Sequence, residues 1–219
     1  MGKFFKNNGL TIVLILLFLA SLVGQWLTGV RHENEELMRH GEEPIGAIAF
    51  LADPQFLSTV FENWESEFLQ MTAFVVLTTF LFQRGSAESE DPDTPPRDGR
   101  LSAISRKAGG PAPLRKGPVT RWLYAHSLGT VLLILFIMSF TLHWLFSARL
   151  AAEQASQHGE AAETFGQYLT SAQLWFESFQ NWQSEFLSTA VLVVLSIWLR
   201  QKDSPESKRV AAPHSQTGG

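Results

Sequence analysis

A gapless internal repeat at an offset of 118 residues constrains this chain more than any other feature. The segment FENWESEFL at 61–69 returns as FQNWQSEFL at 179–187 with seven identities in nine positions. Over the longer segments 55–84 and 173–202, 13 of 30 positions are identical. Each copy also contains two apolar runs. The chain is therefore predicted to consist of a duplicated pair of helices.

The apolar runs indicate helices in a membrane. Residues 10–27 carry no charge, and residues 128–146 contain His143 as their only titratable group. A bilayer core of about 30 Å needs roughly 20 apolar helical residues, and backbone groups in hydrocarbon must be hydrogen-bonded internally. The predicted fold is all-α, an integral membrane four-helix bundle built from a parallel duplication of a two-transmembrane-helix unit. Its spans are expected at about 9–30, 64–83, 124–147 and 182–200.

Four segments follow from this pattern. Residues 1–84 are the first two-helix repeat and residues 122–202 the second. The linker 85–121 and the tail 203–219 are rich in Pro, Gly, Ser and mixed charge. Such segments have little apolar surface to bury, so both are expected to be disordered and cytoplasmic.

The distribution of basic residues predicts the orientation in the membrane. Fourteen of the 17 Lys and Arg residues lie within 1–9, 84–121 and 200–219, whereas the two opposite loops contain only Arg31, Arg39 and Arg149. Loops rich in Lys and Arg stay in the cytoplasm. Both termini and the linker are therefore expected on the cytoplasmic side, which makes the two copies a parallel repeat rather than an inverted one.

Composition excludes several classes of function. The chain contains no cysteine, which rules out disulfides, thiolate metal sites and thiol redox chemistry. Its net charge is −4 and no segment is strongly basic, so no nucleic acid is expected as a partner. No nucleophile elbow, phosphate loop, zinc-protease motif or nucleotide fingerprint is found. We therefore predict no enzyme activity, no catalytic residue and no cofactor.

The repeated motif lies at the predicted outer boundary of the membrane. Trp64 and Trp182 suit an interfacial aromatic belt, as do Trp26 and Trp144 near the ends of the other spans. The motif's two earlier acids become glutamines in the second copy, but Glu67 returns as Glu185. A carboxylate near the hydrocarbon boundary needs a partner, water or a proton, so this pair is expected to have the more specific role.

Helical spacing predicts an inward-facing polar cluster around a pseudo-twofold axis, formed by Gln25, Asn63, Glu67, His143, Asn181 and Glu185. One interpretation is structural, since small and polar residues let membrane helices approach and hydrogen bond. The other is a proton or cation site, because paired carboxylates and a histidine can titrate. His143, Glu67 and Glu185 are adequate metal ligands in type, but no local spacing matches a metal motif, so no metal is predicted.

The segments NNGLTIVLILLFLASLVGQWLTG, FENWESEFLQM and FLFQRGSAES resemble an uncharacterised family of small bacterial inner-membrane proteins with a repeated N-W-x-S-E-F motif. The resemblance spans nearly the whole chain except the linker and tail. It implies a multi-pass protein of the bacterial plasma membrane and supplies no substrate, cofactor or catalytic residue.

Taken together, these observations favour a structural or partner-interacting envelope protein. Its expected partners are the lipid bilayer and either a second copy of the chain or another membrane protein. The alternative is a small oligomeric channel or a proton- or cation-coupled transporter that uses the paired membrane carboxylates Glu67 and Glu185. Four helices leave little room for a pore, so transport requires an assembly of more than one copy.

Overall fold

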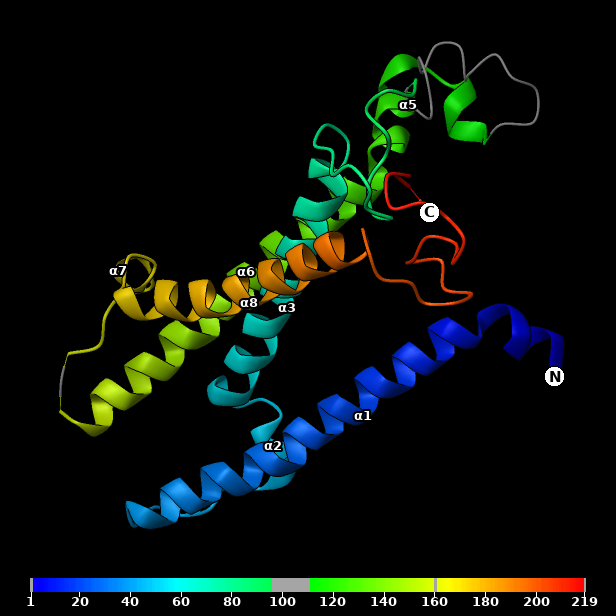
Figure 1. Ribbon diagram of the computed structural model, residues 1–219. Coiled ribbons are helices and arrows are strands. Elements are labelled where there is room, and N and C mark those ends of the chain that lie inside the picture. Colours follow the sequence, from blue (N-terminus) through cyan, green and yellow to red (C-terminus); the bar gives the residue numbers. More distant parts are fainter. Residues whose placement is uncertain (1, 96–110, 160, 219) are drawn as a thin grey trace. The chain divides into compact units, whose positions relative to one another are not determined.

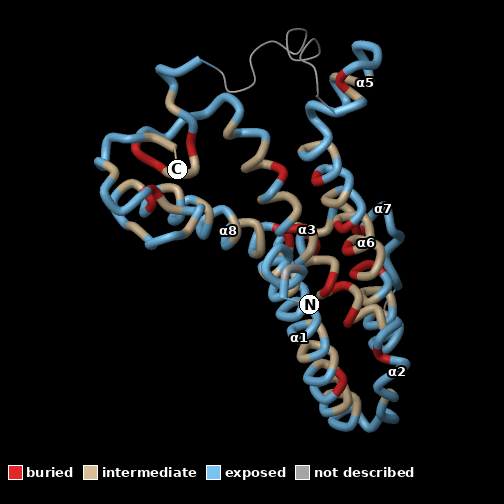
Figure 2. Tube along the Cα trace, turned by 90° about the vertical axis from the view of Figure 1, so that its right-hand side faces the viewer, coloured by how far each residue is buried: buried red, intermediate tan, exposed pale blue. Residues whose placement is uncertain are grey.

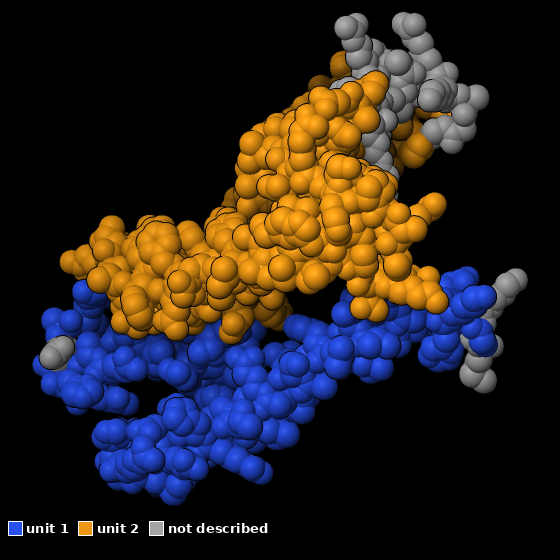
Figure 3. All heavy atoms as spheres, viewed as in Figure 1, with its two compact units in different colours: residues 1–60, 143–165 blue, residues 61–142, 166–219 orange. Residues whose placement is uncertain are grey.

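The computed structural model describes residues 2–95, 111–159 and 161–218, which form helices joined by turns and contain no β-strand. The all-α class is thus confirmed for the described residues. The chain divides into two compact units, Met1–Val60 with His143–Phe165 and Phe61–Leu142 with Gly166–Gly219, which Figure 3 colours separately. They are called unit 1 and unit 2 below, and each is described by itself.

Two long apolar helices stand out in Figure 1, α1 (Gly2–Arg39) and α6 (Ser127–Gln157). Among the described helices, these two are long and apolar enough to cross a membrane. No residue in the most apolar stretch of α1 is buried, and Figure 2 shows this helix almost entirely in pale blue and tan. The corresponding stretch of α6 is partly buried. Four spanning helices, as expected from the sequence, remain a prediction.

Helices α3 (Pro54–Leu77) and α8 (Ala172–Leu195) each contain 24 residues. Their first turns are capped by short polar side chains, as Asp53 accepts from the Gln55 N–H at 2.8 Å and Ser171 from the Leu174 N–H at 3.3 Å. Such caps satisfy N–H groups that have no partner within the helix. Each helix runs through the repeated motif without a break and is about 36 Å long.

Helix α3 ends at Leu77 and α8 ends at Leu195, and each is followed by a turn. Both helices therefore end before residues 83 and 200, the limits predicted for their spans.

Two four-residue helices follow the long apolar ones, α2 (Ala47–Phe50) and α7 (Phe165–Tyr168). The indole N–H of Trp26 donates to the Ala47 carbonyl at 2.7 Å, and that of Trp144 donates to the Phe165 carbonyl at 2.9 Å. Each tryptophan therefore ties its long helix to the start of the short helix that follows.

Unit 1 has a small core around α2. The Phe50 ring is almost fully buried and packs on Phe56 with ring centroids 5.4 Å apart. Gly29 of α1 lies against this ring, because a Cβ at that position would come within 2.9 Å of it. The first turns of α3 meet α6 through the buried hydroxyls of Ser58 and Ser147, whose oxygens are 2.6 Å apart.

Unit 2 has an aromatic core between α8 and the first half of α6. Trp175 packs on Phe140 with ring centroids 5.9 Å apart, and Trp182 meets Phe136 edge to face at 6.4 Å. Leu174 is fully buried beside them. Edge-to-face and tilted aromatic pairs of this kind add to the burial of apolar area.

The segments outside the long helices contain local structure. The linker ends in a 3-10 turn, η1 (Ala112–Arg115), and in α5 (Pro118–Ala125), which are joined by a hydrogen bond from Arg121 Nε to the Leu114 carbonyl. The middle of the linker, 96–110, lies outside the described residues. The described tail, expected to be disordered, forms turns held by serine hydroxyls and main-chain groups. Such hydrogen bonds require no apolar core.

Candidate functional site

The repeated motif joins α3 to α8 within unit 2. Asn181 Nδ2 donates to Glu62 Oε1, and Trp182 Nε1 donates to Glu65 Oε1 at 2.8 Å. One helical turn further along, Gln70 Nε2 donates to Thr189 Oγ1 at 2.6 Å. The polar side chains of the motif and of the turn after it therefore hydrogen bond between the two helices.

Glu65 is the most deeply placed acid of the motif, since its side chain is fully buried. The indole N–H of Trp182 reaches its carboxylate. A buried carboxylate is costly unless it is hydrogen-bonded, so the Trp182 indole is part of what makes this burial possible. Its counterpart in the second copy is Gln183, which is exposed.

Glu67 and Glu185 lie nearer the surface of unit 2. Glu67 is exposed and Glu185 is half-buried, and their carboxylates are close enough to interact electrostatically. The two acids predicted to act as a pair are thus brought together. Both side chains are more exposed to solvent than expected for members of an inward-facing cluster.

The other members of the predicted cluster are divided between the units. Gln25 and His143 belong to unit 1, where Gln25 Nε2 donates to Thr59 Oγ1 at 3.3 Å and His143 is fully buried. Asn63 and Asn181 belong to unit 2, with Asn63 exposed. A single six-residue cluster remains a prediction.

The four tryptophans expected in an interfacial belt make two kinds of contact. Trp26 and Trp144 bind main-chain carbonyls in the two loops. Trp64 packs edge to face on Phe61, whereas Trp182 binds Glu65. Each tryptophan thus has a specific packing or hydrogen-bonding contact in addition to its amphipathic character.

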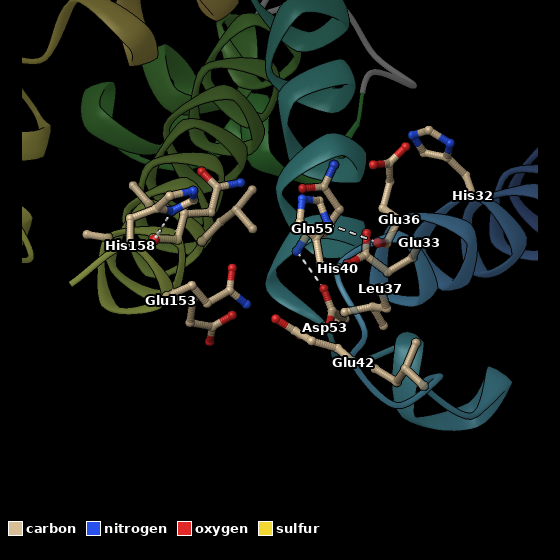
Figure 4. Close-up of a pocket in the computed structure, with 16 residues that line it drawn as sticks. His32, Glu33, Glu36, Leu37, His40, Glu42, Asp53, Gln55, Glu153 and His158 are labelled. Carbon is tan, nitrogen blue, oxygen red and sulfur yellow. Dashed lines mark hydrogen bonds between the residues drawn. The ribbon is translucent and has the colours of Figure 1, made fainter. Parts of the chain in front are cut away.

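Unit 1 contains a cavity of about 920 Å³ that the sequence did not predict. Figure 4 shows its lining, which comes from the polar end of α1, the start of α3 and the last turns of α6. Histidines and carboxylates dominate the lining: His32, Glu33, Glu36, His40, Glu42, Asp53, Glu153 and His158.

Like charges face one another across this cavity. Asp53, at the start of α3, interacts electrostatically with Glu33 of α1 and with Glu153 of α6. His32 and Arg149 partly offset this repulsion. No group of three or more His, Asp or Glu side chains in the described residues has a geometry that could hold a metal ion. The lining therefore creates a negatively charged, water-accessible space.

One sequence signal points to this cavity. His40-Gly41-Glu42 is repeated as His158-Gly159-Glu160, and both histidines line the cavity from opposite sides. Each ring also meets a main-chain carbonyl four residues earlier, at 3.0 Å for His40 and 2.8 Å for His158. The pairing of the two loops could not be inferred, because the repeat shows equivalence and not proximity.

A family model described as a domain of unknown function, DUF6766, matches residues 1–219. The chain belongs to this family. No curated protein and no solved structure gives a significant match to it. The family thus agrees with the uncharacterised family expected from the sequence, and it assigns no activity to the motif or to the cavity.

Proposed function

We propose that this protein is a multi-pass protein of the bacterial inner membrane that acts as a structural or partner-binding component of the envelope. The observation that carries the proposal is the apolar surface of α1, of which no residue in the most apolar stretch is buried. Water cannot solvate such a surface without a large free-energy cost. Lipid and partner helices are the environments that suit it.

Duplication of a two-helix unit is supported by local geometry that recurs 118 residues later. Helices α3 and α8 start 118 residues apart and have equal length, and so do α2 and α7. The two tryptophan-to-carbonyl hydrogen bonds have the same spacing. Four residues with positive φ also pair at a spacing of 118 residues, Gly41 with Gly159 and Gly85 with Asp203.

A parallel arrangement of the copies is supported by the contacts between α3 and α8. The hydrogen-bonded pairs Glu62–Asn181 and Gln70–Thr189 are separated by 119 residues, and Glu65–Trp182 by 117. Equivalent positions of the two copies therefore face each other. A pseudo-twofold axis between two helices of the same direction produces this pattern.

The use of the motif's polar groups favours a structural role over transport. Glu62 and Glu65 accept hydrogen bonds from the neighbouring helix, so these carboxylates hold helices together. Interhelical hydrogen bonds of this kind are a common device for association in membranes. We expect four spans, with both termini and the linker in the cytoplasm, from the distribution of Lys and Arg.

The proposal can be tested by topology mapping and by the size of the assembly. Reporter tags at both termini and in the linker should face the cytoplasm, and a tag at Glu43 should face outward. In mild detergent, light scattering should give a protein mass above the 24.5 kDa of one chain. An outward-facing linker would contradict the proposal, and a single-chain particle in every mild detergent would rule out a second copy as the partner.

A channel or coupled transporter is the second candidate, because the carboxylates of Glu67 and Glu185 interact electrostatically. Reconstitution in liposomes separates the two functions. Proton or cation flux that disappears in the Glu67→Gln, Glu185→Gln double variant, at unchanged thermal stability, would favour transport. Absence of flux in the unaltered protein, with loss of stability in the variant, would favour the structural role.

A further inference from the structure

The ends of α3 and α8 in unit 2 run into turns of the same construction. After α3, the Gln83 N–H donates to Ser89 Oγ at 2.9 Å, and the Glu88 N–H donates to Ser86 Oγ at 3.1 Å. After α8, the equivalent bonds join Gln201 to Ser207 at 2.9 Å and Glu206 to Ser204 at 3.2 Å. The similarity between the copies therefore continues beyond the helices, into the turn segments 83–89 and 201–207, which are identical at four of seven positions.

The turn after α3, residues 83–89, is attached to the end of α8. The hydroxyls of Ser86 and Ser196 are 2.8 Å apart and both serines are buried. The Ala87 N–H also donates to Ser196 Oγ at 3.2 Å. Two contacts at Ser196, the C-cap of α8, thus link the end of the first copy to the end of the second.

The C-terminal residues close over this junction. The Gly85 N–H donates to Thr217 Oγ1 at 3.0 Å, and the Gly218 N–H donates to the Ser86 carbonyl at 2.9 Å. The Lys208 amino group is buried and donates to the carbonyls of His214 and Gln216, at 3.0 Å each. The lysine therefore holds the C-terminal residues in the shape that reaches the turn.

Two properties of Gly85 bear on this closure, its backbone conformation and its lack of a side chain. Its φ of +83° is rarely adopted by residues with a side chain, yet the equivalent Asp203 tolerates a φ of 64°. A Cβ at residue 85 would come within 2.8 Å of the His214 carbonyl oxygen, which belongs to the backbone. Close approach of the C-terminal segment, more than backbone conformation, thus selects glycine here.

We infer that residues 208–218 form a latch, a conformational device that holds the turn after α3 against the end of α8 and keeps the ends of these two helices together. Release of the latch would free the α3 turn from Ser196 and let the two helix ends separate. Arg200, which follows α8, also contacts this segment, since its guanidinium donates to the Ala212 carbonyl at 3.2 Å. The inference does not depend on the membrane proposal, because each contact lies within unit 2.

Disulfide trapping in the full-length protein tests the latch, because the chain contains no cysteine. The reporter is the Ser86→Cys, Ser196→Cys double variant, because the ends of these two side chains are in contact, 2.8 Å apart. Adding Lys208→Met or Gly85→Asn should slow cross-linking by about tenfold, since each removes or blocks contacts of the latch. Adding Asp203→Asn, the matched change in the second copy, should leave the rate unchanged.

A second reporter in unit 1 distinguishes release of the latch from a general folding defect. The Ser58→Cys, Ser147→Cys pair replaces hydroxyls that are 2.6 Å apart and belong to unit 1, whereas the latch belongs to unit 2. Its cross-linking rate should not respond to Lys208→Met or to Gly85→Asn. Unchanged rates at the Ser86 and Ser196 reporter would overturn the inference, and so would an equal loss of rate at both reporters.

Discussion

At the scale of residues, the acid that the structure buries differs from the one that the sequence selected. Glu67 and Glu185 were predicted to have the specific role because both copies keep a carboxylate there. Glu65, whose counterpart is Gln183, is the fully buried acid. Comparison of two copies favours features that both retain. A hydrogen bond between the two helices can instead use an acid from one copy of the motif and a tryptophan from the other.

The Trp182→Phe variant should be less stable by about 1 to 3 kcal/mol, because the buried Glu65 carboxylate loses a hydrogen-bond donor. Phenylalanine keeps an aromatic ring but removes the N–H that donates to Glu65, together with part of the indole packing on Phe136 and Phe179. Thermal and denaturant unfolding in one detergent would measure it. Trp198→Phe is the matched control, since that side chain is 55% exposed, and it should change stability little. Equal effects of the two substitutions would show that the bond to Glu65 is unimportant.

The carboxyl pair Glu88 and Glu206 should make stability depend on pH. Burial, then the charge of Glu206 and a hydrogen bond with it, raises the pKa of Glu88 above its ordinary value of 4.5. Because the folded-state pKa is raised, this contribution is complete below pH 4.5 and is lost as pH rises through the raised pKa. Glu88 is partly exposed, so we expect an effect below about 1 kcal/mol.

Unfolding midpoints measured from pH 4.5 upward would reveal this dependence. Glu206→Gln should flatten it, because an amide can donate to the Glu88 carboxylate without a shared proton. Glu90 is a neighbouring exposed acid. The Glu90→Gln variant should therefore show the same dependence of stability on pH as the unaltered protein. A profile that Glu206→Gln does not alter would assign the pH dependence to other groups.

At the scale of elements, the ends of helices are easiest to infer from the sequence where they depend only on nearby residues. The caps at Asp53 and Ser171 and the end of α1 near Gly41 each depend on a few neighbouring residues. The C-terminal limits of α3 and α8 were placed too far along the chain. An apolar run continues beyond both helices, but hydrophobicity alone does not determine where a helix ends.

Two glycines of α1 should respond in opposite directions to the same substitution. A Cβ at Gly29 would meet the buried Phe50 ring at 2.9 Å, whereas a Cβ at Gly24 would meet nothing within 4 Å. Gly29→Ala should therefore destabilise unit 1 by about 1 to 3 kcal/mol through overpacking. Gly24→Ala should be neutral or stabilising by up to about 1 kcal/mol, since alanine favours helix. Thermal unfolding of the two variants compares them directly, and stabilisation by Gly29→Ala would contradict the packing of α1 on α2.

At the scale of the whole molecule, local chemistry predicted the helical class but not the cavity of unit 1. The equivalence of His40 and His158 was visible in the sequence, and their meeting around one space was not. Long-range proximity depends on how helices pack. An internal repeat shows which positions are equivalent, but it does not show which loops face each other. In the tail, serine hydroxyls accept hydrogen bonds from main-chain N–H groups, contacts that composition does not reveal.

A charge in the centre of α1 should distinguish lipid from water as the surroundings of this helix. Leu16 and Met38 are 59% and 58% exposed, but Leu16 lies in the apolar stretch and Met38 at the polar end. Leu16→Arg should oppose membrane insertion by about 3 kcal/mol, whereas Met38→Arg should have little effect. The fraction of protein recovered in alkali-washed membranes measures this. Full recovery of Leu16→Arg would argue against α1 as a span.

The tie between each tryptophan and the following short helix has a consequence for how this chain can vary. Both ties close a segment of the same span, 21 residues from donor to acceptor. Substitutions inside the closed segment leave the anchor points intact, which lets the two loops diverge in charge while their ends stay aligned. Adding or deleting one residue in the helical part would rotate the indole by about 100° and detach it. Such length changes should be tolerated only outside the tied segments.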